Sequence, residues 1–462
     1  MLKVYNTLSR KKEEFNSLVK DEVTFYHCGP TVYWTQHIGN MRAMVLADLV
    51  RRSLDYLGYE VKMVRNYTDV GHLTSDGDTG DDKMEKTAKA EKASPKEVAN
   101  KYIKSFDNDV ADLNVITPEE TPKATDNVGE MKKMIKKLLD NGYAYETELA
   151  IYFDTSKFEK YGELSGQKPE DKLADTGKGE ISDETKKNPA DFAVWFFKAG
   201  VHENALQTWS NTPIKEEGEG FPGWHIECSA MSQKYLGVTQ DLHMGGIEHM
   251  PVHHENEIAQ SEAATGKKYV NYWLHNEHLT VDGSKMSKSE GTAYSLDEIK
   301  EKGYDPLVLR YFFLGAHYRS KQNFTWEALD GVKVALDKLR ARVTELKKNK
   351  PGRISHEYQE QFTEVISDDF NSPQALAIIW DMLKSGIGEN DKLATIMDFD
   401  KVLGLNLDKQ NKIPQEVTKL ANEREKARAE KNWEESDRLR DEIVKLGYQI
   451  DDGEGGYKIK QG

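Results

Sequence analysis

A short motif rich in lysine and serine could hold a polyphosphate. Lys285-Met286-Ser287-Lys288-Ser289 follows Gly283, so two ammonium groups and two hydroxyls stand on one glycine-preceded loop. Cations and hydroxyl donors of this kind stabilise phosphate oxygens whose charge changes during a reaction. A solvent-exposed loop is the alternative interpretation, because runs of lysine and serine are common on protein surfaces.

A second motif with phosphate-binding character lies earlier in the chain, at His37-Ile38-Gly39-Asn40. It precedes a helical pattern, so it would stand at a helix N-terminus, where backbone N–H groups and the helix dipole favour anions. Gly39 would let the backbone approach a ligand, and His37 and Asn40 could donate hydrogen bonds to phosphate oxygens. A histidine at a helix start is more often a capping or surface residue, so this motif becomes informative only together with the lysine motif.

Four side chains from distant parts of the chain have the chemistry of a zinc site. Cys28 and Cys228 are the only cysteines, and His253 and Glu257 stand four residues apart, which would place both on one face if the segment is a helix. Two thiolates, one imidazole and one carboxylate form a ligand set that zinc accepts. From spacing alone, two buried structural cysteines and a surface histidine explain the same residues equally well.

Alternating strands and helices must position these motifs in the first half of the chain. The run 23–28 is rich in β-formers, apolar residues at helical spacing cover 41–57, and 60–64 alternates like a strand. This order predicts a parallel sheet with helices on its faces. A charged, glycine-containing insertion occupies 154–220, and we expect the sheet to resume at 223–228.

Helices are expected to dominate the second half. Apolar residues at three- and four-residue steps between Val332 and Leu346 predict a helix that ends before Pro351-Gly352. We expect a looser linker over 398–414, a long helical stretch over 417–446 and a terminal hairpin that turns at 453–456.

The motifs at 37–40 and 285–289 together resemble the HIGH and KMSKS signatures of the class I aminoacyl-tRNA synthetases. The resemblance implies an α/β fold, in which a Rossmann-type parallel-sheet catalytic domain with an insertion is followed by a C-terminal α-helical bundle and a small terminal subdomain. We expect the catalytic domain at 1–118 and 205–300, the connective insertion at 119–204, the stem-contact region and helical bundle at 301–409, and an anticodon-binding subdomain at 410–462.

The same resemblance assigns ATP binding to a set of residues in the two motifs: His37, Gly39, Asn40, Lys285 and Lys288. Asn40 stands where the signature has a second histidine. Asparagine donates a neutral hydrogen bond to phosphate but cannot become cationic, so this position would supply less charge stabilisation.

The stretches around the two cysteines resemble the cysteinyl-tRNA synthetases within that class. The resemblance implies that one zinc ion is held by Cys28, Cys228, His253 and Glu257 and binds the substrate thiolate. A hydrophobic pocket separates cysteine from serine poorly, because one small group is worth only about 1–3 kcal/mol. A zinc–sulfur bond separates them well.

Two further residues are expected at the amino-acid pocket. Trp224 matches the aromatic that walls the pocket in the family, although core packing is the ordinary role of such a tryptophan. Thr31, just past Cys28, could offer its hydroxyl to the same pocket, and stabilising a turn is an equally good explanation.

The resemblance implies ATP-dependent ligation of L-cysteine to tRNA(Cys) through a cysteinyl-adenylate, with Mg²⁺ accompanying ATP. One alternative is a cysteine ligase that acts on an amino sugar, which the presence of 410–462 disfavours. The other is a synthetase-like RNA-binding protein without catalysis, which the intact 285–289 motif and the complete zinc ligand set disfavour.

One segment departs from the sequence that is usual in the family. Where the family reads Asn-Ile-Thr-Asp-Ile-Asp-Asp-Lys, this chain separates Asn66-Tyr67-Thr68-Asp69-Val70 from Asp81-Asp82-Lys83 by residues 71–80. A longer surface loop is the simpler interpretation, and a lid over the adenylate pocket is the sharper one.

A polyanionic partner needs a basic surface on a chain whose net charge is −15. Eight basic and two acidic residues between positions 333 and 353 give a local charge of +6, which makes this segment a candidate phosphate-binding face. The tRNA contacts expected there are Lys333, Lys338, Arg340, Arg342, Lys347 and Lys348. Trp433 could anchor a core or stack on a base, and we favour the core because apolar residues continue its helix pattern.

Composition bounds the remaining possibilities. The 462 residues contain no apolar run near the ~20 residues that span a bilayer, and the N-terminus shows no secretory pattern. Two cysteines are too few for a disulfide framework, which favours a reducing, cytoplasmic compartment. We expect a monomer that binds no membrane.

Overall fold

The computed structural model describes residues 1–73, 82–167, 185–214, 218–287, 291–409, 415–446, 448–453 and 456–461. At its centre lies a parallel four-stranded sheet in the order β11–β10–β3–β4. Its strands are β3 (Glu22–His27), β4 (Glu60–Arg65), β10 (Gln240–Gly246) and β11 (Val270–Asn276). The strands predicted near 23–28 and 60–64 are therefore confirmed.

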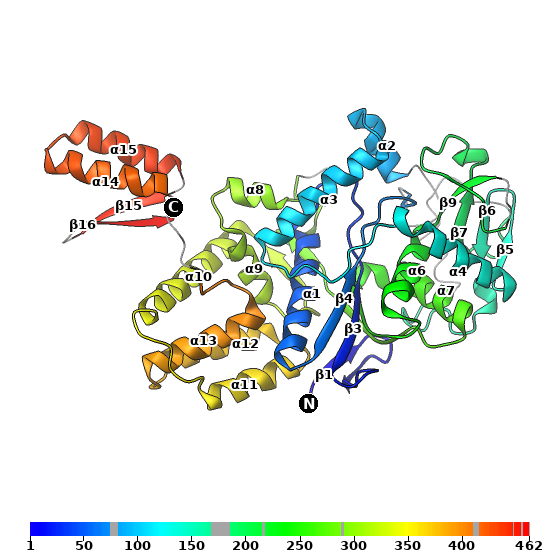
Figure 1. Cartoon of the computed structure of the whole chain (residues 1–462), viewed down its shortest axis with the longest axis horizontal. Helices are drawn as coiled ribbons and strands as arrows, with labels where there is room; N and C mark the ends of the chain where they lie inside the picture. The colour runs from blue at the N-terminus through cyan, green and yellow to red at the C-terminus, as the bar shows by residue number, and fades with distance from the viewer. Residues whose placement is uncertain are drawn as a thin grey trace.

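Helix α1 (Ile38–Tyr56) connects β3 to β4 and buries the apolar stripe that the sequence predicted. Its first residues carry the His37–Asn40 motif. Figure 1 shows α1 lying along β3 and β4, so the helix N-terminus and the ends of the strands belong to one region of the molecule.

The expectation that the sheet resumes at 223–228 is wrong. Gly223 is the extended N-cap of helix α6 (Trp224–Leu236), and the segment is helical from its first residue. Helix α7 (Glu255–Thr265) packs against α6, and α6 also contacts β3 and β4. Because Trp224 and Cys228 are four residues apart on α6, both fall on one side of that helix.

The insertion contains its own antiparallel sheet in the order β5–β6–β7–β9–β8. Its strands are β5 (Ala144–Glu146), β6 (Ala150–Phe153), β7 (Phe192–Phe197), β8 (Trp209–Ser210) and β9 (Glu219–Pro222), so the sheet continues past residue 204. Between β4 and β5 the structure describes the helices α2 (Lys83–Glu91), α3 (Pro95–Asp112) and α4 (Val128–Asp140). Figure 1 shows this sheet at one end of the molecule.

The helical second half begins after β12 (Leu279–Val281) and β13 (Ser284–Lys285). These strands form a small sheet with β14 (Gln322–Phe324), which lies between two of the helices. Its helices are α8 (Leu296–Glu301), α9 (Pro306–Leu314), α10 (Trp326–Leu346), α11 (His356–Ser367), α12 (Ser372–Lys384) and α13 (Glu389–Leu403). The helix predicted up to Leu346 is confirmed as α10. The looser linker expected from residue 398 is wrong in its first part, because α13 continues to Leu403.

The C-terminal part is a helix pair and a hairpin, drawn at the opposite end of Figure 1 from the insertion sheet. It comprises α14 (Gln415–Ala429), α15 (Trp433–Lys445), β15 (Tyr448–Gly453) and β16 (Gly456–Gln461). The helical stretch expected over 417–446 is thus two helices, separated by a turn in which Lys431 has φ 60°. The predicted hairpin is confirmed, since Gly453 pairs with Gly456.

The remaining elements are short. The N-terminal strands β1 (Lys3–Asn6) and β2 (Lys11–Glu14) pair with each other. Among the described residues, 3-10 turns lie at Thr125–Asn127, Thr155–Lys157, Gly200–His202 and Ile247–His249, and a π-helical turn lies at Met250–His254. Within the described ranges, no helix combines the length and the apolarity that crossing a membrane would require.

A buried ion pair ties α1 to the helical bundle. Arg310 of α9 is fully buried and donates to Asp48 of α1 at 2.5 Å. It also donates to the backbone carbonyls of Leu113, Asn114 and Leu403. Burial alone would raise the pKa of Asp48, but Arg310 and Arg52 outweigh it and hold this pKa below its ordinary value. Arg310 therefore joins α9 to three other segments in the interior: α1, residues 113–114 and the end of α13.

Candidate active site

The four predicted metal ligands come together in the interior, at the carboxyl end of the parallel sheet. Cys28 directly follows β3, Cys228 lies on α6, His253 lies in the π-helical turn and Glu257 lies in the first turn of α7. One ligand atom from each lies within 4.8 Å of all the others, and all four residues are buried. His253 Nε2 is 3.0 Å from Glu257 Oε1. This edge of a parallel sheet is where ligands bind in α/β folds.

Two more histidines, which were not among the residues predicted from sequence, share this cluster. His243 of β10 and His254 of the π-helical turn each place Nε2 3.4 Å from Cys28 Sγ. With Cys28 and Glu257 they form a second possible ligand set. The adjacent pair His253-His254 was the available signal, but neighbouring residues on a regular helix point about 100° apart, so sequence gave no reason to place both in one cluster.

Hydrogen bonds orient the buried groups. Tyr269 donates from its hydroxyl to Glu257 Oε2 at 3.0 Å, and His225 Nδ1 lies 2.9 Å from His253 Nδ1. His254 Nδ1 lies 2.8 Å from His275 Nε2. Outer partners of this kind fix ring orientation and tautomer in metal sites.

The donor set fits a divalent metal ion. Burial raises the pKa of the Glu257 carboxyl and of the Cys28 thiol well above their ordinary values, so the cluster would be costly to ionise without a compensating cation. A tetrahedral zinc ion with bonds of about 2.0–2.3 Å separates its ligand atoms by about 3.3–3.8 Å. Donor atoms that already lie within 4.8 Å of one another match this requirement with small side-chain adjustments.

The two predicted pocket residues, Thr31 and Trp224, are joined by a histidine. Trp224 stacks on His253, with ring centroids 4.4 Å apart. His72 stacks on Trp224 at 4.0 Å with ring planes 10° apart, and its Nδ1 lies 2.6 Å from Thr31 Oγ1. His72 belongs to the segment that departs from the family's usual sequence. The hypothesis of a lid over 71–80 concerns mainly residues 74–80, which lie outside the described residues.

The His37–Asn40 motif forms the N-terminus of α1. The Asn40 N–H donates to His37 Nδ1 at 3.2 Å, and the His37 N–H donates to Asn40 Oδ1 at 3.2 Å, which is a capping box. The first turn of α1 contains no acidic side chain, so nothing there opposes an anion. His37 is therefore confirmed as a capping residue. Its role in binding an anion stays a prediction.

The two signature motifs pack against each other. A Cβ atom built on Gly39 would overlap Met286 Cε, the mobile end of that side chain, so an alanine at this position would have to displace Met286. The N–H of Ile38 donates to the carbonyl of Tyr294 at 2.8 Å, which holds the segment after the lysine motif beside α1. Lys285 is exposed at the end of β13. Lys288 lies outside the described residues.

The expected tRNA-binding face on and beyond α10 is only partly free. Arg340 pairs with Asp305 at 2.7 Å, and Arg342 pairs with Glu345 and Glu389. Lys347 donates to two backbone carbonyls. Lys338 and Lys348 are exposed, and Lys333 is half-buried. The charge of +6 counted from sequence therefore overstates what this face offers to phosphate.

Trp433 is 58% exposed, so the core role expected for it is wrong. It opens α15, outside the stripe of Leu439 and Ile443 that the helix buries. The Arg428 guanidinium lies 5.9 Å from the Trp433 ring centroid. An exposed indole beside a guanidinium is suited to stacking on a nucleic-acid base.

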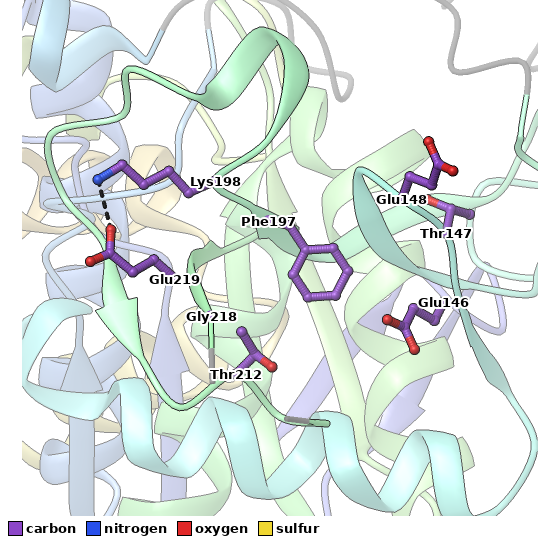
Figure 2. Close-up of a pocket in the computed structure, with 8 residues that line it drawn as sticks. All are labelled: Glu146, Thr147, Glu148, Phe197, Lys198, Thr212, Gly218 and Glu219. Atoms are coloured by element: carbon purple, nitrogen blue, oxygen red, sulfur yellow. Dashed lines mark hydrogen bonds and ion pairs between the residues drawn. The ribbon is translucent and has the colours of Figure 1, made fainter. Parts of the chain in front are cut away.

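The insertion sheet carries a separate pocket of about 560 Å³. Figure 2 shows its wall: Glu146, Thr147, Glu148, Phe197, Lys198, Thr212, Gly218 and Glu219. Lys198 and Glu219 form an ion pair of 2.7 Å on one side of it, away from Glu146 and Glu148. None of the site residues predicted from sequence lines this pocket, so its chemistry is separate from that of the cluster at the sheet edge.

Comparison with known proteins identifies relatives along the whole chain. Residues 14–334 match the family model of the class I (C) tRNA synthetase catalytic domain, and residues 410–458 match that of the cysteinyl-tRNA ligase anticodon binding domain. Cysteine–tRNA ligase 1 of Burkholderia lata is 41% identical over 99% of this chain and 96% of its own length. Cysteine–tRNA ligase of Treponema denticola is 40% identical over 98% of each chain.

Among solved structures, the fold resembles methionyl-tRNA synthetase of Mycobacterium tuberculosis in complex with methionyl-adenylate. The TM-score is 0.56 at 15% identity, and the match covers 83% of this chain and 90% of that one. At this identity the likeness concerns the fold alone, and it agrees with the predicted Rossmann-type sheet followed by a helical bundle.

Proposed function

The chain belongs to the cysteine–tRNA ligase family of the class I aminoacyl-tRNA synthetases, and from this premise we propose that it joins L-cysteine to tRNA(Cys) at the expense of ATP. The observation that carries the proposal is the gathering of Cys28, Cys228, His253 and Glu257 beside Trp224. A thiol-recognising metal site is the feature that a cysteine-specific enzyme needs and that enzymes for other amino acids do not.

Cys28, Cys228, His253 and Glu257 would hold one zinc ion per chain. When bound, zinc, which can expand from four to five ligands, would take the substrate thiolate in addition to these four residues and so favour cysteine over serine. Trp224 and Thr31 would line the pocket beside it, where the flat indole limits the size of the side chain that enters. Tyr269 keeps the Glu257 carboxylate oriented through its hydrogen bond.

Activation of the amino acid would take place at the N-terminus of α1. The cysteine carboxylate attacks the α-phosphorus of ATP, which gives cysteinyl-adenylate and releases pyrophosphate. His37, Asn40 and the backbone at Gly39 would bind the phosphates, with Mg²⁺ accompanying the nucleotide, and Lys285 and Lys288 would stabilise the leaving pyrophosphate. No protein nucleophile is required, because positioning and electrostatics supply the catalysis.

Transfer then requires the tRNA. A hydroxyl of its terminal ribose attacks the adenylate carbonyl and releases AMP. The matched anticodon-binding region at 410–458 carries the exposed Trp433, which is available to stack on an unpaired base. The exposed cations Lys338 and Lys348 would contact phosphates between the two ends of the bound tRNA. We propose that one chain serves one tRNA as a monomer.

Cysteine-dependent exchange of pyrophosphate into ATP, followed by charging of tRNA(Cys), tests the function. We expect both activities, no exchange with serine, and about one zinc per chain by elemental analysis. In Cys228→Ser the zinc content should fall together with exchange. Exchange without charging would point to the amino-sugar ligase, and the absence of exchange would leave only an RNA-binding protein.

A further inference from the structure

The segment that departs from the family's usual sequence is closed at its base. Leu73 and Asp82 form an antiparallel bridge, and the Lys83 N–H donates to the His72 carbonyl at 3.0 Å. Asp82 caps α2 by accepting from the Glu85 N–H. These contacts bring Lys83 next to His72, although the two residues are eleven positions apart.

His72 lies between a cation and the amino-acid pocket. Its ring is buried, with 7% exposure, and stacks on Trp224. Lys83 Nζ lies 2.7 Å from His72 Nε2, and Thr31 Oγ1 lies 2.6 Å from His72 Nδ1. Both ring nitrogens are therefore within hydrogen-bond distance of a partner.

These two contacts determine which group donates in each hydrogen bond between Lys83, His72 and Thr31. An ammonium group only donates, so His72 Nε2 must be an acceptor, and the neutral ring then carries its proton on Nδ1. The Nδ1–H donates to Thr31 Oγ1. Once that oxygen has accepted from the ring, the Thr31 hydroxyl has its own proton left to donate.

The backbone of Thr31 is held as well. Thr31 forms a parallel bridge with Thr68, and the Gln36 side-chain amide donates to the Thr31 carbonyl at 3.1 Å. The hydroxyl is therefore a pre-oriented donor, three residues after Cys28. A bound amino acid offers two anionic groups to such a donor, and the thiolate is already assigned to the metal ligands, which leaves the carboxylate.

We propose that His72 is a positioning residue of the amino-acid pocket, which fixes the Thr31 hydroxyl as a donor to the carboxylate of the bound cysteine. The inference rests on the proposed function and adds to it a residue from the departing segment. The stack on Trp224 sets the plane of the imidazole, and Lys83 sets its tautomer. Neither His72 nor Lys83 touches the reacting atoms.

Three substitutions separate the hydrogen bonds from the ring packing. His72→Phe keeps an aromatic ring against Trp224 and removes both hydrogen bonds. His72→Asn places an amide N–H where Nδ1–H stood and so keeps the donor to Thr31. Thr31→Val removes the hydroxyl with little change of shape and leaves His72 in place, which keeps the test valid if a His72 variant folds poorly.

In pyrophosphate exchange, we expect His72→Phe and Thr31→Val each to raise the KM for cysteine about tenfold, and to leave the KM for ATP within about twofold. This corresponds to the loss of one oriented hydrogen bond. His72→Asn should stay within about threefold of wild type. The double variant His72→Phe/Thr31→Val should be no worse than either single one, since both changes remove the same bond.

Equilibrium binding gives a second measurement. Cysteamine has the thiol and the amine of cysteine but no carboxylate, so calorimetry should show that His72→Phe and Thr31→Val weaken cysteine about tenfold and cysteamine less than twofold. Equal weakening of both ligands, an unchanged KM in His72→Phe, or multiplied losses in the double variant would each overturn the inference. If wild type catalyses no cysteine-dependent exchange, the proposed function fails and this inference fails with it. If wild type is active and His72→Phe has an unchanged KM for cysteine, the proposed function stands and only the inference about His72 is refuted.

Discussion

Arg310 offers the most direct test of how the catalytic sheet and the helical bundle are held together. Arg310→Met keeps most of the side-chain volume and removes every donor. The carbonyls of Leu113 and Leu403 then lose their guanidinium donor in the interior, and Asp48 keeps only Arg52 and the Ile116 N–H as partners.

The expected loss of unfolding free energy follows from the buried acceptors that no longer have Arg310 as a donor. A buried acceptor without a donor costs about 1–3 kcal/mol, and removing one partner of a buried ion pair costs about 3–5 kcal/mol. The two estimates overlap, because the same guanidinium serves both sets of acceptors, and the methionine regains some apolar burial. We therefore expect Arg310→Met to lower the free energy of unfolding by about 4 kcal/mol.

Urea unfolding followed by circular dichroism at pH 7 measures this change. Arg438→Met is the matched control: its guanidinium is about half exposed and pairs with Glu435 and Glu442 on α15, so its removal should change the free energy of unfolding far less than Arg310→Met does. Since Arg310 also orients the bundle against α1, tRNA charging should fall more than pyrophosphate exchange. A loss equal to that of Arg438→Met would refute the reasoning.

Three further predictions address the site and its surroundings. Gly39→Ala places a Cβ against the mobile end of Met286, so exchange should slow only about two- to threefold and recover in Gly39→Ala/Met286→Ala; a double variant as slow as the single one contradicts the contact. Burial, with Asp297 nearby, raises the pKa of Asp109 to about 7. Because the unfolded carboxyl ionises near 4, folding stability should fall as pH rises from about 4 to 7. We therefore compare the melting temperature of Asp109→Asn with that of wild type at two pH values. The difference, variant minus wild type, should be on the order of 2 °C larger at pH 8 than at pH 5. An equal difference at both pH values contradicts this. Trp433→Ala should weaken tRNA binding about tenfold in a filter assay without changing the melting temperature, and a lowered melting temperature would restore the core interpretation.

The parts of the site that could be predicted are those whose residue types restrict the chemistry. Two cysteines, a histidine and a glutamate allow few shared roles, and the structure gathers all four. The His37–Asn40 motif was placed correctly at a helix start, because strand, helix and strand alternate clearly around it.

The parts that were missed depend on local geometry that residue type does not encode. His254 reaches the cluster because the chain makes a π-helical turn just before α7. His72 reaches the pocket because the departing segment closes at its base. The segment 223–228 is too short for its periodicity to distinguish a strand from the buried start of a helix. The pattern therefore predicts a strand where α6 begins. Trp433 shows that an apolar residue at the first position of a helix need not belong to its buried stripe.

The order of the central sheet has a consequence for how the chain folds as it is made. Strand β3 pairs with β4 through a local connection, but its other neighbour is β10. Cys28 and His243 are 215 residues apart, a length that takes roughly 10–40 s to synthesise. Pairings over such a distance also form slowly after synthesis. During this interval Cys28 lacks the contacts with His243, His254 and Glu257 that bury it in the finished fold, so we expect its thiol to react with oxidants and metal ions until those residues are made.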